Sequence, residues 1–129
     1  LCDIYEKHVR SILEYGAVVW HAGLTHVDTM NIERVQKTAF SVILGKDYIS
    51  YENSLSVLGM KKLENRREAL CAQFARKALK SDKVSSWFVR DQKEVNTRRT
   101  EKTVKEVQTR TSRFRKSALP YIKTILNKS

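Results

Sequence analysis

The chain of 129 residues contains only four glycines and two cysteines. Four glycines leave little material for the glycine-rich loop that cradles phosphates after a strand, and no such loop is present. Cys2 and Cys71 each stand in an apolar, helical stretch, which favours buried free thiols in a reducing compartment over a disulfide. His8, His21 and His26 have no cysteine or histidine partners at the spacing of a zinc site. We therefore expect no metal ion and no other cofactor.

Motifs of catalysis are also absent. The sequence has no nucleophile elbow, in which a serine stands between glycines at a sharp turn. It has no pair of acids in an apolar setting, as general acid and base catalysis would require. We therefore expect that the chain is not an enzyme by itself and takes no small-molecule substrate.

Long apolar runs are lacking as well. The longest, around "GAVVW" at residues 16–20, is far shorter than the roughly 18 to 20 residues that a bilayer requires. The N-terminal stretch "LCDIYEKHVR" contains acids and lacks the long apolar centre of a cleavable signal. These features predict an intracellular protein with no membrane partner, and they leave both the nucleus and the cytoplasm open as locations.

Positive charge is what the chain has in excess. It contains 25 Lys and Arg against 14 Asp and Glu, which gives a net charge of +11. Residues 89–129 carry 12 of these cations and 4 of the acids, and potential core residues become scarce at the same place. Phosphate polyanions and anionic membrane surfaces are the usual acceptors of such a field. The sequence therefore predicts a boundary after Phe88 and an anionic partner for the region beyond it.

Local capping signals mark where helices begin and end. Thr25 followed by Asp28 resembles a capping box, with Asp in place of the usual Glu. Ser50 is a candidate N-cap, and Gly45 and Gly59 are candidate helix ends. Apolar residues between these signals recur with helical periodicity. Together they predict helices over residues 2–20, 26–44, 51–58, 61–80 and 117–126.

The fold class expected from this pattern is mainly α. We expect a small antiparallel helical bundle over residues 1–88, followed in residues 89–129 by a basic extended arm and a short C-terminal helix. Trp87 and Phe88 are expected to pack back on the bundle as an anchor. At about 100° per residue, the faces expected to be buried are Cys2, Tyr5, Val9, Ile12, Gly16, Val19 and Trp20 in the first helix, Ile32, Val35, Ala39, Val42 and Ile43 in the second, Leu63, Leu70, Phe74 and Ala78 in the fourth, and Leu119, Ile122, Ile125 and Leu126 in the last.

A basic stripe follows the helix over residues 61–80. Lys62, Arg66, Gln73, Lys77 and Lys80 lie within about 60° of one another on this helix. Like charges one turn apart weaken a helix slightly, so a bound anion would explain them. The alternative is a solvated face that binds nothing.

Arg67 points to the apolar face of the same helix, between Leu63 and Leu70. A buried guanidinium must be paired, because an isolated charge is costly to desolvate. We expect a structural salt bridge, with Glu14 or Glu33 as the partner.

The stretch "QTRTSRFRKS" at residues 108–117 places cations around one aromatic ring. Arg110, Arg113, Arg115 and Lys116 can contact phosphates and release counterions, and Phe114 can stack on an unpaired base. Arg98, Arg99 and Lys105 extend this set through an arm that nucleic acid would order on binding. The alternative is a solvated linker with Phe114 packed on the bundle.

Four ordered motifs resemble one protein family. They are "SILEYGAVVW" at residues 11–20, "IERVQKTAFSVILG" at 32–45, "YENSL" at 51–55 and "RREALCAQFA" at 66–75. In this order they resemble the region that follows the palm in reverse transcriptases of non-LTR retrotransposons, especially jockey-like elements of invertebrates. The resemblance covers residues 5–88, and "TRTSRFRKSALPYI" is similar to the tail of that family.

The resemblance implies a thumb and C-terminal region. Its expected partners are RNA, an RNA–DNA or DNA duplex, and an upstream palm and fingers domain that carries the catalytic aspartates. Some related elements end in a zinc knuckle, for which this sequence has no candidate ligands. Two other classes stay open: a sequence-specific DNA-binding domain, with Arg34, Lys37 and Thr38 on a recognition helix, and a protein interaction module that binds an acidic partner.

Overall fold

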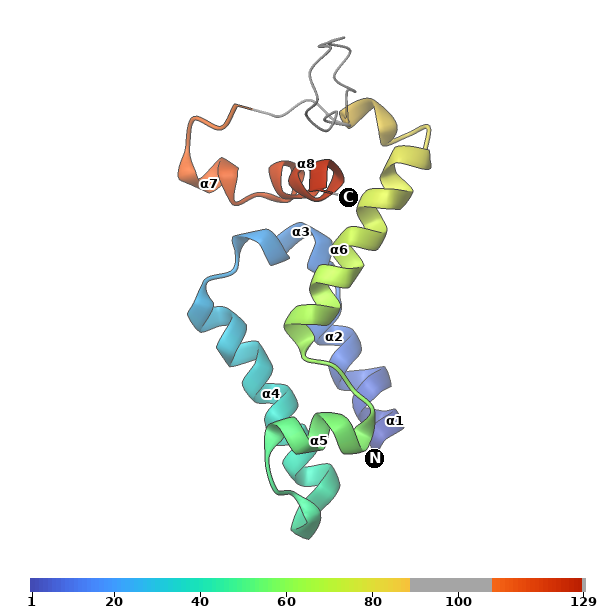
Figure 1. Cartoon of the computed structure of the whole chain (residues 1–129), viewed down its shortest axis with the longest axis vertical. Helices are drawn as coiled ribbons and strands as arrows, with labels where there is room; N and C mark the ends of the chain where they lie inside the picture. Colours follow the sequence, from blue (N-terminus) through green and yellow to red (C-terminus); the bar gives the residue numbers. More distant parts are fainter. Residues whose placement is uncertain (89–107, 129) are drawn as a thin grey trace. The chain divides into compact units, whose positions relative to one another are not determined.

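Helices are the only regular elements in the computed structural model, which describes residues 1–88 and 108–128 (Figure 1). This agrees with the mainly helical class predicted from the sequence. The α-helices are α1 (Cys2–Ile4), α2 (Ser11–Glu14), α3 (Ala17–Trp20), α4 (His26–Leu44), α5 (Tyr51–Leu58), α6 (Leu63–Lys80), α7 (Ser112–Arg115) and α8 (Ala118–Lys128). A π-helical turn occupies Tyr5–Arg10, and 3₁₀ turns occupy His21–Gly23, Gly45–Asp47 and Ser85–Trp87. Within the described ranges, no helix is long and apolar enough to cross a membrane.

The chain divides into two compact units, each assembled from two stretches of sequence. The first unit comprises Leu1–Ala17 and Leu24–Ala69, and the second comprises Val18–Gly23 and Leu70–Ser129. The boundaries between the units fall within α3 and within α6, so each of these helices contributes residues to both units. The domains expected from the sequence, 1–88 and 89–129, stay a prediction.

The N-termini of α4 and α5 form as their sequence signals predict. The Asp28 amide donates to Thr25 Oγ1 at 3.2 Å, and the Thr25 amide donates to Asp28 Oδ2 at 3.2 Å. This reciprocal pair is a capping box, and the hydrogen bonds from Thr25 lower the pKa of the Asp28 carboxyl. At α5, the Asn53 amide donates to Ser50 Oγ at 3.2 Å. Capping is thus confirmed at both helices.

Glycines end both helices, also as predicted. Gly45 follows α4 with a φ of 54°, and Gly59 follows α5 with a φ of 63° in the left-handed region. After α5, the Gly59 amide donates to the Ser56 carbonyl oxygen at 3.3 Å and the Met60 amide to the Leu55 carbonyl oxygen at 2.9 Å. These two bonds form a Schellman motif.

Replacing Gly59 with alanine is expected to lower the free energy of unfolding by about 1 to 2 kcal/mol, because a Cβ disfavours the left-handed backbone. A Cβ there would contact nothing within 4 Å, so backbone strain alone sets the cost. Urea unfolding measures the change. The control is Gly23→Ala: Gly23 does not have a positive φ, and its new Cβ would lie an ordinary 3.5 Å from the Lys116 carbonyl oxygen. Equal losses in the two variants would contradict this reading.

The N-terminal helix differs from its prediction. A π-helical turn at Tyr5–Arg10 interrupts the α-helical register, and Gly16, with a φ of 62°, ends the helix altogether. A π turn contains more residues than an α turn, so side chains after it rotate away from the face that a constant 100° step assigns. Tyr5 is buried as predicted, but Ile12 and Val19 are 74% and 72% exposed. The single buried face predicted for residues 2–20 is therefore wrong.

The buried face of α4 is also rotated from the predicted one. Val35 and Val42, expected in the core, are 42% and 68% exposed. Phe40 and Gln36 are fully buried in their place. Ala39 and Ile43 do pack against the core, as predicted. A glutamine thus occupies a core position that apolar periodicity had assigned to valines.

The core of the first unit combines apolar packing with buried hydrogen bonds. Phe40 lies beside the rings of Tyr5 and Tyr51, with ring centroids 5.7 Å and 5.9 Å apart. Gln36 Oε1 accepts from the Tyr5 hydroxyl at 2.7 Å, and Gln36 Nε2 donates to the Tyr51 hydroxyl at 2.9 Å and the Lys61 carbonyl oxygen at 3.0 Å. Burial raises the pKa of Tyr5 to about 12, so its phenol stays a hydrogen-bond donor at neutral pH.

Glu33 joins this network from the same helix. Its Oε1 accepts from the Tyr51 hydroxyl and from the Leu63 amide, the latter at 3.2 Å. Leu63 is the first residue of α6, so the carboxylate satisfies an amide that the helix itself leaves without a partner. Burial first, and then the hydrogen bond to Glu33, raise the pKa of Tyr51.

Arg67 is fully buried, as the sequence predicts. The two carboxylates predicted as its partners both form hydrogen bonds with other groups. Glu14 binds the neighbouring Arg66, with its Oε2 3.1 Å from Arg66 Nη2, and Glu33 binds Tyr51 and the Leu63 amide. Glu14 and Glu33 therefore each bind a group in the first turn of α6, and the salt bridge predicted for Arg67 stays a prediction.

The second unit has its own apolar core. It is formed by Ala75 and Ala78 of α6, Phe88, and Ile122 and Leu126 of α8, all buried. The terminal helix and its apolar face thus follow the prediction. Of the expected aromatic anchor, only half is confirmed, because Phe88 is buried while Trp87 is 61% exposed. Trp20, expected in the same core as Tyr5, belongs to this second unit and is half-buried.

Candidate nucleic-acid interface

The positive charge of the chain is concentrated in one of the two units. The first unit contains nine Lys and Arg and nine Asp and Glu, so its formal net charge is zero. The described residues of the second unit contain ten Lys and Arg and a single acid, Asp82, a difference of nine. A field of one sign over one unit attracts a polyanion to that unit and not to the other.

The basic stripe of α6 follows this division. Lys62, in the loop before α6, forms an ion pair with Glu52 at 2.8 Å, and this hydrogen bond raises the pKa of Lys62. Arg66 forms a bidentate ion pair with Glu14, whose hydrogen bonds raise the pKa of the guanidinium. Carboxylates of the first unit therefore already neutralise both residues.

The C-terminal part of the stripe has a different environment. Gln73, Lys77 and Lys80 are exposed and belong to the second unit. No ion pair involves Lys77 or Lys80 within residues 1–88 and 108–128. Of the four cations predicted on this face, Lys77 and Lys80 are therefore the two that carboxylates of the described residues do not neutralise.

The stretch at residues 108–117 forms a helical turn that the sequence analysis did not predict. Thr111 caps α7 (Ser112–Arg115), its Oγ1 accepting from the Phe114 amide at 3.2 Å. Arg110 and Arg113 are exposed, and Phe114 is 39% exposed. This turn therefore presents its cations and part of Phe114 to solvent.

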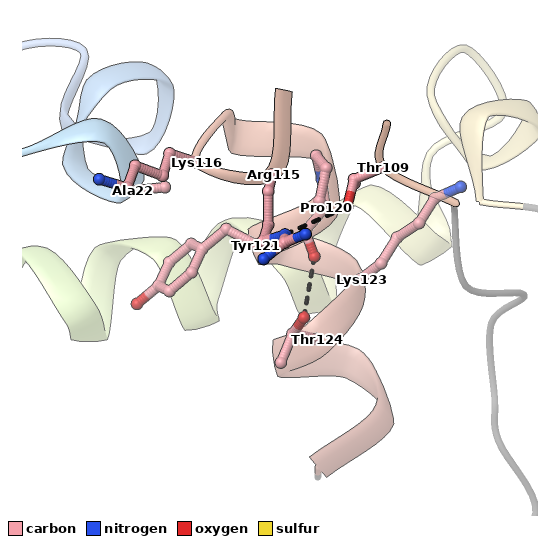
Figure 2. A pocket seen from close by; sticks show the side chains of 8 residues that line it. All are labelled: Ala22, Thr109, Arg115, Lys116, Pro120, Tyr121, Lys123 and Thr124. Atoms are coloured by element: carbon pink, nitrogen blue, oxygen red, sulfur yellow. Dashed lines mark hydrogen bonds between the residues drawn. The ribbon is translucent and has the colours of Figure 1, made fainter. Parts of the chain in front are cut away.

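A pocket of about 320 Å³ lies where α7 meets the first turns of α8 (Figure 2). Arg115 crosses it, and Arg115 Nε donates to Thr109 Oγ1 at 3.4 Å. The pocket contains three cations, two threonine hydroxyls and no acid. Its lining residues are Ala22, Thr109, Arg115, Lys116, Pro120, Tyr121, Lys123 and Thr124.

The turn at His21–Gly23 forms part of the same region. The rings of His21 and Tyr121 meet edge to face with centroids 5.6 Å apart. Gly23 approaches the chain after α7 closely enough that a Cβ would lie 3.5 Å from the Lys116 carbonyl oxygen. These contacts hold α8 and the residues after α7 beside the turn.

Lys123 is a pocket residue that the sequence analysis missed. It is 7% exposed, although it carries an ammonium group, and it lines the pocket. A signal was present in the sequence, since Lys123 lies four residues after Leu119 and three before Leu126, both predicted core positions. A lysine at such a register position is unusual, because lysines are almost never buried unless paired.

The other predicted site residues stand as follows. Arg98, Arg99 and Lys105 lie outside the described residues. Arg110, Arg113, Phe114, Arg115 and Lys116 come together around α7 in the second unit, whereas Lys62 and Arg66 belong to the first unit and form ion pairs there. In the part of the chain that the structure describes, no three His, Cys, Asp or Glu side chains gather as they would around a metal ion.

Comparison of the chain with protein-family models, with curated proteins and with solved structures found no match.

Proposed function

We propose that this chain binds nucleic acid as the thumb and C-terminal region of an RNA-directed DNA polymerase from a jockey-like non-LTR retrotransposon. The observation that carries the binding role is the separation of charge between a neutral unit and a strongly cationic one. Phosphates are the partners that such a field favours, because neutralising them releases counterions. In the proposed role the cationic unit contacts the template RNA or the template–primer duplex.

The polymerase assignment rests on the four ordered motifs. They lie on α2 with α3, on α4, on α5 and on α6, so each belongs to a helical element. The finer architecture predicted from the helical pattern is an antiparallel bundle over residues 1–88 with a basic extended arm. The resemblance adds an upstream palm and fingers domain. That upstream domain would carry the catalytic aspartates, and this chain would bind the template RNA or the template–primer duplex.

The test is a fourfold variant, Arg110→Ala, Arg113→Ala, Arg115→Ala and Lys116→Ala. If all four side chains contact phosphates, the slope of log affinity for single-stranded RNA against log salt falls by about 0.7 for each lost contact, or roughly 3 in total. The loss should be similar for unrelated RNA sequences, because phosphate contacts carry no base information. Fluorescence anisotropy with a labelled oligoribonucleotide at several salt concentrations measures both quantities.

A matched control removes four cations from the neutral unit. Lys7, Arg34, Lys37 and Lys46 are all exposed, and none of them forms an ion pair in the described part of the chain. Replacing these four with alanine removes the same formal charge, and the salt slope should stay that of the unmodified chain. A fourfold α7 variant with unchanged affinity and slope, or a control with an equal loss, would contradict the proposal.

The two other classes give different results in the same experiment. A sequence-specific DNA-binding domain would prefer one duplex sequence strongly at fixed salt and would lose that preference on replacement of Arg34, Lys37 and Thr38. A protein interaction module would bind an acidic partner with an affinity that survives alanine at Arg110, Arg113 and Arg115. Phe114→Ala adds a further distinction, since loss of base stacking weakens binding of single strands more than binding of duplex without changing the salt slope.

A further inference from the structure

An apolar stripe on α4 is left exposed in the first unit. Val27, Val35 and Val42 are 64%, 42% and 68% exposed. At about 100° per residue the three valines lie within about 80° of one another, so they share one face along most of this continuous helix. Val35 and Val42 are also residues that apolar periodicity assigned to a core. A solvent-facing row of apolar residues on a helix marks a surface that another element covers.

A groove of about 420 Å³ lies beside this stripe, between α4 and the π-helical turn. Val9 of the turn and Ala39 of α4 line it, and both also pack against the core of the first unit. The groove is therefore built on the packed part of that unit. A recess of this kind receives apolar side chains from one face of a bound helix. Its lining residues are Val9, Asn31, Arg34, Val35, Thr38 and Ala39.

The charges on this side of α4 select the partner. Arg34, the only charged residue in the lining, and Lys37 are both exposed. Neither side chain forms an ion pair or a hydrogen bond with the described residues. The two acids of α4 have other partners, since Asp28 belongs to the capping box and Glu33 to the buried network. The groove thus carries positive charge without compensation, and an acidic partner complements it.

A second copy of the chain does not complement this face. Arg34 lies near the middle of the stripe, which extends from Val27 to Val42. A two-fold pairing of α4 with α4 of another copy, whether parallel or antiparallel, would bring the two Arg34 guanidinium groups together. The groove lining contains no acid to separate them, and like charges opposite one another disfavour an interface. The occupant is therefore a different chain.

We propose that this groove and the valine stripe bind an amphipathic, acidic helix of another protein. Its apolar side chains would cover Val35 and Val42, and its flanking carboxylates would pair with Arg34 and Lys37. Such a helix presents its apolar anchors at every third or fourth residue. The inference goes beyond the proposed nucleic-acid function, because it assigns a protein interface to the unit that carries no net charge.

The test uses a labelled synthetic peptide of roughly three heptads, with Leu at the a and d positions and Glu at e and g. Fluorescence anisotropy should show saturable binding to the full chain. A scrambled peptide of the same composition has no continuous apolar face and should bind about tenfold more weakly or worse. A peptide with Lys in place of every Glu should lose about as much, because it repels Arg34 and Lys37.

Variants of the chain locate the binding. Val35→Gln together with Val42→Gln should weaken binding of the Glu peptide by about tenfold, since both anchors lose their apolar contact. The matched control is Ile49→Gln together with Val57→Gln, two residues of the same unit that are 78% and 64% exposed and lie outside α4. It should leave the affinity within about twofold. Arg34→Gln should remove most of the preference for the Glu peptide over the Lys peptide.

The remaining outcomes distinguish other occupants. Sedimentation equilibrium of the chain alone should show a monomer; a dimer that the double valine variant dissociates would identify a second copy as the occupant and overturn the inference. Absence of binding to the Glu peptide, or unchanged binding by the double valine variant, would also overturn it. The fourfold α7 variant should keep its peptide affinity, and loss of that affinity would place the binding on the cationic unit instead. The proposed function is tested separately, because RNA affinity should not change in the double valine variant.

Discussion

Replacing Phe40 with alanine is expected to lower the free energy of unfolding of the first unit by about 3 to 5 kcal/mol, the usual cost of truncating a fully buried aromatic residue. Phe40 has no exposed surface, and it packs against the rings of both Tyr5 and Tyr51. Its removal would take apolar contacts from both rings and leave a cavity between them. Urea unfolding followed by circular dichroism measures the loss.

Val42→Ala on the same helix is the control. Val42 is 68% exposed, so its truncation should change stability by less than about 0.5 kcal/mol. The comparison also decides which face of α4 is buried, since apolar periodicity assigns Val42 to the core. A larger loss for Val42→Ala than for Phe40→Ala would show that the buried face described for α4 is wrong.

Replacing Gln36 with leucine is expected to cost about 3 kcal/mol, although leucine is apolar and close to glutamine in size. Three groups depend on this side chain: the Tyr5 hydroxyl, the Tyr51 hydroxyl and the Lys61 carbonyl oxygen. Each buried group left without its partner costs about 1 to 3 kcal/mol. Relaxation of the surrounding side chains would recover part of that sum.

Gln73→Leu supplies the matched comparison, because Gln73 is an exposed glutamine on α6. The same chemical change should there leave the free energy of unfolding within about 0.5 kcal/mol of its original value. Chemical denaturation of both variants under one set of conditions gives the difference. If Gln36→Leu proved neutral or stabilising, the buried hydrogen bonds would contribute nothing net and the core would tolerate a wholly apolar filling.

The features that the sequence predicted well are set by short-range chemistry. Thr25 and Asp28 are three residues apart, and the capping box they form needs no other part of the chain. Ser50 and Gly59 likewise mark the ends of α5 through bonds to residues at most four positions away. Such signals can be read from sequence because the atoms that satisfy them are neighbours in it.

Which face of each helix is buried depends on longer-range packing, and there the prediction failed in two helices. The step of 100° per residue holds only for a continuous α-helix, and the π turn and Gly16 break that continuity before α3. On α4, the hydroxyls of Tyr5 and Tyr51 make Gln36 a suitable core residue. Apolar periodicity cannot find a polar residue whose burial depends on partners 31 and 15 positions away.

The same distinction applies to the residues of the candidate site, which stays a prediction. The cations around Phe114 are adjacent in sequence, so their clustering is visible without a structure. Neutralisation of Arg66 is not visible, because Glu14 lies 52 positions away. Lys123 was missed because a charged residue is read as solvent-exposed unless a pocket is known to receive it.

The two units also differ in their natural chromophores, tryptophan and tyrosine. Both tryptophans, Trp20 and Trp87, belong to the second unit, whereas four of the five tyrosines belong to the first. Tryptophan emission therefore reports on the unit that contains α7 and α8. Near-ultraviolet dichroism of tyrosine reports mainly on the unit that contains Phe40 and Gln36.

The two cysteine thiols also belong to different units and differ in exposure. Cys71 is buried in the second unit, while Cys2 is partly exposed in the first. A thiol-reactive dye should therefore attach at Cys2 and add a fluorescent reporter to the unit that lacks tryptophan. Each half of the molecule can be followed by its own optical signal in one sample, without introducing or removing a single residue.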